Sequence, residues 1–189
     1  MGKIDLKPYE YIFLVGLLAY TAGQFLIFVF FNDLDALHAQ EPIDFAHWLM
    51  LIGVLLLTPQ ATHFPKFIFN LLGTPLLILG IGLIIGMCVL DFVFWSIKSP
   101  ELKSEIAAHL IGTPAIWAPF MTLSGKIFNL GLLISSFSYF NTSKVGPLVV
   151  LLGTFIVYAG GGWLNVLGYL VLTAGFAYCF YKQNLSQEA

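Results

Sequence analysis

The residues of this chain that could perform chemistry are acids and histidines gathered at two points. The first pair is Asp44 and His47, three residues apart. The second pair is Glu105 and His109, four residues apart. A spacing of four puts two side chains on one helix face, with about 5 to 6 Å between their Cβ atoms. Carboxylate oxygens and imidazole nitrogens are ligands for zinc, iron and manganese, so these four residues form a candidate divalent-metal site.

The same residues also have a structural interpretation. Acids and histidines at helix starts act as caps or as favourable partners of the helix dipole. The linker before Asp44 concentrates further charges of this kind, among them Asp35, His38 and Glu41. The spacing of the acids and histidines matches no established metal-ligand signature, so the sequence supports both interpretations.

Four other polar residues lie inside apolar segments and are candidates for binding a substrate or an ion: Asp91, Gln24, Asn70 and Asn129. A carboxylate such as Asp91 is costly in lipid and usually faces a bundle interior or a cavity, where it handles ions or protons. Asn70 and Asn129 occupy equivalent positions in two Ile-Phe-Asn-Leu strings. The alternative role of the three amides is hydrogen bonding between helices.

These residues stand in a chain that is too apolar for an ordinary soluble domain. Of its 189 residues, 59% are hydrophobic and 10% are charged, whereas soluble domains carry about 25% charged residues. Apolar segments follow one another from Tyr9 to Tyr181, and roughly 20 helical residues cross a hydrocarbon core about 30 Å thick. We therefore predict an all-α, polytopic integral membrane protein, with residues 1–189 forming one transmembrane domain and the lipid bilayer as its partner.

The composition also argues against several classes of protein. There is no arginine, the eight lysines are dispersed and the net charge is −2, so no basic patch for nucleic acid is expected. Cys88 and Cys179 lie far apart in apolar segments, which predicts buried thiols without redox chemistry. The signatures of zinc proteases, serine hydrolases and nucleotide-binding loops are missing from the sequence.

The apolar segments and their breakers predict about seven membrane-spanning helices, with six as the alternative. Proline and glycine clusters separate the segments. Pro114 and Pro119 interrupt the fourth helix, and Ala159 to Gly162 form the turn before the last one. The expected helices cover about 9–31, 47–58, 67–97, 105–120 and 126–139, followed by two helices within 145–181.

An echo in the sequence suggests a duplicated helical hairpin. An acid-histidine pair followed by a Lys-led Ile-Phe-Asn-Leu string occurs twice, over 44–71 and 105–130. On this hypothesis helices 2 and 3 correspond to helices 4 and 5, and helices 2 and 4 begin at the same membrane face. That face would carry both acid-histidine pairs, with Asp91 toward it.

We expect the protein to bind or transport a small solute or ion through a polar site reached from this face. The proline-broken fourth helix favours this function, because broken helices expose backbone groups that coordinate substrates in transporters. One alternative is a non-catalytic subunit of a larger membrane complex or a homo-oligomer. The other is a membrane-embedded metal-dependent enzyme, and the sequence favours the roles without catalysis.

Overall fold

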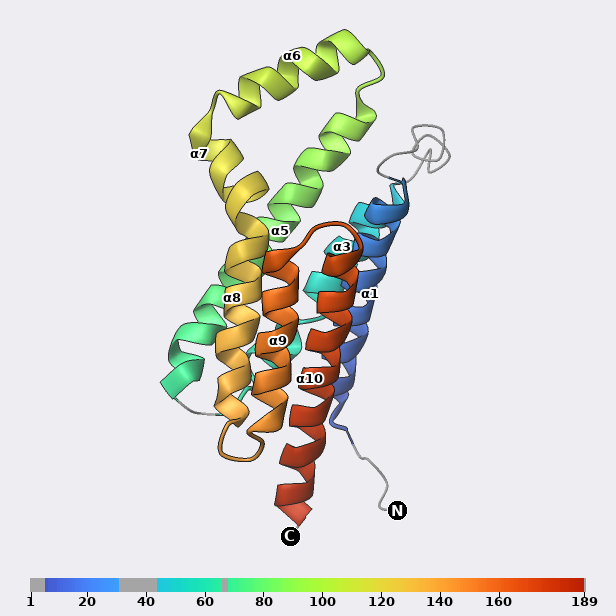
Figure 1. Cartoon of the computed structure of the whole chain (residues 1–189). Helices are drawn as coiled ribbons and strands as arrows, with labels where there is room; N and C mark the ends of the chain where they lie inside the picture. Colours follow the sequence, from blue (N-terminus) through green and yellow to red (C-terminus); the bar gives the residue numbers. More distant parts are fainter. Residues whose placement is uncertain (1–5, 31–43, 66–67, 189) are drawn as a thin grey trace.

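A computed structural model describes residues 6–30, 44–65 and 68–188 of the chain. Every regular element within these ranges is a helix (Figure 1). The prediction of an all-α fold is therefore confirmed. The polar linker that contains Asp35, His38 and Glu41 lies outside the described residues.

Four helical segments are long and apolar enough to cross a membrane. They are α1 (Pro8–Phe30), α5 (Ile68–Ser96), the continuous segment Pro114–Tyr139, and α10 (Trp163–Glu188). Two shorter apolar helical segments, Phe45–Ala61 and Val145–Ala159, pack beside them. The predicted count of seven spans is not confirmed.

The remaining bounds are α3 (Phe45–Leu55), α4 (Thr58–Ala61), α6 (Pro100–Ile111), α7 (Pro114–Trp117), the π-helical η1 (Ala118–Leu123), α8 (Ser124–Ser136), the 3₁₀ turn η2 (Phe137–Tyr139) and α9 (Val145–Ala159).

The predicted fourth helix, over 105–120, is wrong. α6 ends at Ile111, and Thr113 adopts the non-helical angles φ −115° and ψ 82°. The cause is Pro114, which lacks an amide hydrogen and disfavours helical angles in the residue before it. Figure 1 shows α6 lying across the end of the bundle, while α7, η1 and α8 continue along it. Pro119 is accommodated by the wider π-helical turn of η1.

The other helices pack most extensively as three hairpins: α1 with α3, α5 with α8, and α9 with α10. Glycines bring the paired backbones together. A Cβ atom added at Gly53 of α3 would lie 2.6 Å from the backbone nitrogen of Tyr20 in α1. One added at Gly153 of α9 would lie 2.7 Å from the carbonyl oxygen of Gly168 in α10. Such close approach gains van der Waals contact, which holds helices together where lipid provides no hydrophobic drive.

These hairpins differ from the predicted duplication. The sequence echo paired helix 2 with helix 3 and helix 4 with helix 5, whereas α3 packs mainly on α1 and α5 packs mainly on α8. The second copy of the echo begins in α6, which buries no residue. Because α6 lies off the bundle, it is no structural counterpart of α3.

Aromatic side chains fill the core between the first and third hairpins. Phe13 of α1 packs edge-on against Phe176 of α10, with ring centroids 4.9 Å apart, and also against Phe180 at 5.7 Å. Phe64, which follows α4, contacts Phe13 at 6.0 Å. Edge-to-face pairs of this kind suit the quadrupoles of the rings. We call Phe13, Phe64, Phe176 and Phe180 the aromatic layer.

Candidate functional site

Asp44 places His47 at the start of α3. The Oδ1 atom of Asp44 accepts a hydrogen bond from the backbone N–H of His47 at 3.1 Å, which makes Asp44 the N-cap of the helix. A capping carboxylate satisfies an amide that has no partner within the helix and interacts favourably with the helix dipole. Its other oxygen, Oδ2, lies 2.6 Å from Nδ1 of the His47 ring. One aspartate thus begins the helix and orients the imidazole.

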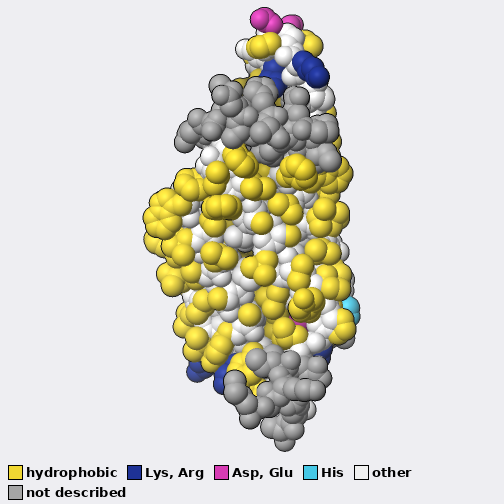
Figure 2. All heavy atoms as spheres, turned by 90° about the vertical axis from the view of Figure 1, so that its right-hand side faces the viewer, with side chains coloured by type: hydrophobic (Ala, Val, Ile, Leu, Met, Phe, Trp, Pro, Cys, Tyr) yellow, Lys and Arg dark blue, Asp and Glu magenta, His cyan; other side chains and the backbone are white. Residues whose placement is uncertain are grey.

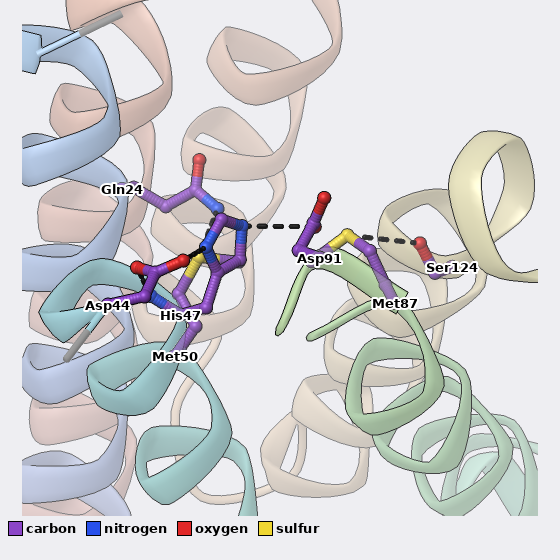
Figure 3. Close-up of polar contacts among 7 residues, drawn as sticks. All are labelled: Gln24, Asp44, His47, Met50, Met87, Asp91 and Ser124. Carbon is purple, nitrogen blue, oxygen red and sulfur yellow. Dashed lines mark hydrogen bonds and ion pairs between the residues drawn. The ribbon is translucent and has the colours of Figure 1, made fainter. Parts of the chain in front are cut away.

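The second ring nitrogen of His47 faces a different hairpin. Its Nε2 atom lies 3.0 Å from Oδ2 of Asp91, near the end of α5 (Figure 3). We call Asp44, His47 and Asp91 the acid-histidine triad. The side chains are 14%, 18% and 25% exposed respectively, so the triad is mostly buried but still reaches the surface. His47 is therefore a polar link between α3 and α5.

The triad holds one proton more than a neutral imidazole and two carboxylates would carry. A neutral imidazole has one N–H group, and an ionised carboxylate can only accept hydrogen bonds. Because both ring nitrogens of His47 face carboxylate oxygens, either the ring carries two protons or one carboxyl group is protonated. Burial raises the pKa of Asp44, but the hydrogen bonds and positive charge of His47 outweigh it and hold that pKa below its ordinary value. The triad can therefore take up and release a proton.

An amide and two methionine sulfurs lie next to the triad (Figure 3). Nε2 of Gln24 in α1 is 3.4 Å from Sδ of Met50, which follows His47 by three residues. On the other side, Oγ of Ser124 is 3.9 Å from Sδ of Met87, one turn before Asp91 in α5. Thioether sulfur is a weak acceptor, so these contacts are polar but easily exchanged.

Two buried tyrosines, Tyr20 and Tyr169, lie between Gln24 and the interior of the bundle. Tyr20, one turn before Gln24, packs edge-on against Tyr169 of α10, with ring centroids 4.9 Å apart. Its hydroxyl interacts with the side chains of Gln24 and Tyr169. The hydroxyl of Tyr169 also accepts a hydrogen bond from Nδ2 of Asn129 in α8 at 2.9 Å. Asn129 is 2% exposed, and its Oδ1 atom has no hydrogen-bond partner among the described residues. We call Gln24, Tyr20, Tyr169 and Asn129 the inner polar line.

Three of the four residues predicted to bind a substrate or an ion belong to these polar groups. Asp91 is part of the triad, and Gln24 and Asn129 are the ends of the inner polar line. Asn70 lies elsewhere: its Oδ1 accepts a hydrogen bond from Thr74, and its Nδ2 lies 3.4 Å from the carbonyl oxygen of Phe64. The two asparagines of the sequence echo thus have different surroundings, and Asn70 ties α5 to the segment before it.

The structure does not bring the four predicted metal ligands together. Asp44 and His47 are in the triad, whereas Glu105 and His109 are exposed on α6. Among the described residues, no group of three or more His, Cys, Asp or Glu side chains is arranged to hold a metal. The physical reason is the turn before Pro114, which takes α6 out of the bundle.

Sequence reasoning missed Tyr20 and Tyr169. The spacing of four between Tyr20 and Gln24 places both on one face of α1 and could have indicated a polar face in an apolar helix. No comparable signal exists for Tyr169, because its partner Asn129 lies 40 residues away on another helix. Only the packing of α1, α8 and α10 brings these groups together.

No family model, curated protein or solved structure matches the chain.

Proposed function

We propose that the protein is a multi-pass integral membrane protein with six crossings, two in each hairpin. The outer surface supports this, since large apolar side chains such as Leu71 and Phe155 are 75% and 68% exposed. Figure 2 shows hydrophobic side chains over the middle of one face, with most of the visible charged ones near its ends. Exposing such surface to water costs about 25 cal/mol per Å², and lipid removes that cost. The shorter segments Phe45–Ala61 and Val145–Ala159 then cross with their hairpin partners.

Within this bundle the acid-histidine triad acts as the proton-binding site of a transporter for a small solute or ion. The observation that carries the proposal is the His47 ring, held at 2.6 and 3.0 Å between carboxylates of two different hairpins. When the extra proton leaves, one ring nitrogen presents a lone pair to a carboxylate oxygen. When that nitrogen is Nε2, its contact with Asp91 becomes repulsive, and the polar link between α3 and α5 is lost. Proton occupancy therefore controls how the first two hairpins pack.

The inner polar line provides the groups that would receive a polar solute. A buried acceptor without a donor, such as Oδ1 of Asn129, costs about 1–3 kcal/mol. A solute that donates a hydrogen bond there offsets this cost. The line begins at Gln24, beside the triad, so solute binding and proton binding occur in neighbouring parts of the same bundle.

Proton flux in liposomes tests this function. The purified protein is reconstituted with a pH-sensitive dye inside, and a pH gradient is imposed in the presence of a permeant counter-ion. We expect the wild-type protein to dissipate the gradient, and His47→Gln and Asp91→Asn to lose most of that flux. The matched control is His109→Gln, which removes an exposed histidine of α6 and should keep the wild-type rate. Equal flux in His47→Gln, or none above protein-free liposomes for the wild type, would refute the proposal.

A further inference from the structure

A second carboxylate is buried at the opposite end of the bundle. Glu10 lies in the first turn of α1, beside the last turns of α10, and is 2% exposed. Figure 1 shows these two helix ends together at one end of the bundle. Its Oε2 atom accepts hydrogen bonds from the backbone N–H of Lys7 at 2.9 Å and from Nδ2 of Asn184 at 2.8 Å. Both donors are uncharged groups, so they orient the carboxylate without neutralising it.

Two basic side chains described at this end of the bundle, Lys7 and His63, are engaged elsewhere. Nζ of Lys7 donates to Oε1 of Gln187 at 2.9 Å. The ring of His63 stacks on Tyr9 at 4.3 Å, and its Nδ1 lies 2.7 Å from the carbonyl oxygen of Pro59. The ion pairs within the described part of the chain are the two of the triad. A buried carboxylate without a counter-charge is costly, because burial removes the water that stabilises its charge.

An amide oxygen without a donor belongs to the same part of the bundle. Gln60 of α4 is fully buried, and its Nε2 donates to the hydroxyl of Tyr139 at 3.0 Å. Its Oε1 atom has no hydrogen-bond partner among the described residues. α4 packs on α1, and the Phe64 ring contacts both Phe13, one turn after Glu10, and Tyr139. The three side chains therefore lie in one region of the bundle. We call Glu10, Gln60 and Tyr139 the basal oxygen cluster.

The basal oxygen cluster is separate from the triad. The aromatic layer follows it directly, since Phe13 is one turn after Glu10 in α1 and packs against Phe176 and Phe180. Tyr139 contacts the same layer, with its ring 5.7 Å from Phe180. The inner polar line begins beyond these rings. A ligand of the cluster therefore does not depend on the proton that the triad holds.

We propose that Glu10 and Gln60 form a binding site for a monovalent alkali cation, sodium or potassium. Hard cations take oxygen ligands such as carboxylates and amide carbonyls. Both kinds of oxygen are present here: the Glu10 carboxylate lacks a counter-charge, and Oε1 of Gln60 lacks a hydrogen-bond donor among the described residues. Because the cluster contains one carboxylate, a single positive charge neutralises it. The hydroxyl of Tyr139 holds the Gln60 amide in place.

Thermal unfolding of the full-length protein in detergent tests this site. The salts are sodium, potassium and choline chloride at equal ionic strength. Ligands that bind only the folded state stabilise it by RT ln(1 + L/Kd), where L is the ligand concentration, so the Tm rises with the logarithm of that concentration above the Kd. We expect the wild-type Tm to rise with sodium or potassium relative to choline, and whichever ion gives the larger shift is the better ligand. Glu10→Gln and Gln60→Leu should lose this salt-specific rise, and His109→Gln, which changes an exposed residue of α6, should keep it.

Each contrary result overturns the site in a defined way. Equal Tm values in the three salts, or a salt-specific rise that persists in Glu10→Gln, would exclude a cation at the cluster. Stabilisation by acid and not by either alkali ion would identify the ligand as a proton and refute the proposal. If Glu10→Gln does not fold, binding of radioactive sodium and potassium is measured on the wild type and on Gln60→Leu. Binding that is absent from the wild type, or equal in the two proteins, would exclude the site. None of these outcomes depends on proton flux through the triad.

Discussion

The triad and the basal oxygen cluster both bury carboxylates, at opposite ends of the bundle, under opposite electrostatic conditions. In the triad, His47 lies between two acids whose side chains keep some exposure. In the basal oxygen cluster, Glu10 is 2% exposed and is held by uncharged donors. An internal partner with access to the surface suits exchange of a proton. A buried carboxylate without a positively charged partner in the protein, such as Glu10, suits the binding of a cation that neutralises it.

The largest effect on stability is expected from His47→Leu. This change leaves Asp44 and Asp91 facing each other without the group between them. Breaking a buried ion pair costs about 3–5 kcal/mol, and the remaining exposure of the triad places the expected loss near 3 kcal/mol or below. Denaturant unfolding in detergent measures it. Adding Asp91→Asn to His47→Leu should recover part of the loss, whereas a fully stable His47→Leu would show that the triad does not hold α3 to α5.

A smaller loss is expected from Tyr169→Phe, which tests the region between the two ends. The hydroxyl accepts a hydrogen bond from Asn129 and belongs to a ring that packs against Tyr20, and its removal leaves a buried amide donor unsatisfied. A loss of about 2 kcal/mol in the free energy of unfolding follows. The salt-specific rise in Tm at the basal oxygen cluster should be unchanged. If that rise disappears as well, the two ends are coupled through the tyrosines and do not act independently.

In choline chloride, without alkali cations, Glu10→Gln and Asp91→Asn should change the stability of the protein in opposite directions. Removing the uncompensated charge of Glu10 should leave stability unchanged or raise it by about 1 kcal/mol, as when buried charges are replaced by neutral groups. Asp91→Asn should lower stability, because His47 loses an ionic partner. Unfolding of both variants in choline chloride makes the comparison. A loss of stability in both would show that the Glu10 carboxylate is compensated within the folded protein.

The smallest effect concerns acid stability. The pKa of Asp44 is lowered in the folded state, where the hydrogen bonds and charge of His47 outweigh burial. A lowered pKa contributes stability that is present above the unfolded-state pKa and is lost as the pH falls through the folded-state value. Helicity followed by circular dichroism should therefore fall less steeply with acid in Asp44→Asn than in the wild type. Identical acid profiles would mean that Asp44 has no charged partner in the folded state.

The sequence alone determined the helices that have clear breakers. The predictions for α1 and α5, over 9–31 and 67–97, agree with the structure to within a residue. The turn predicted at Ala159 to Gly162 also separates α9 from α10, and Gly162 there has a φ of +60°. Apolar length, glycine and proline act locally, so local reasoning finds their effects. The candidate importance of Asp91 followed in the same way, from one carboxylate in an apolar segment.

Tertiary structure decided which polar groups meet. The meeting of His47 with Asp91, of Tyr20 with Tyr169 and of Gln60 with Tyr139 depends on which helices form hairpins, and glycine contacts between backbones set that pairing. Spacing within one helix could not predict these contacts, and it wrongly joined α6 to the bundle. Helices form through hydrogen bonds between near neighbours in sequence, whereas the binding groups of this protein are assembled by side-chain packing between distant ones.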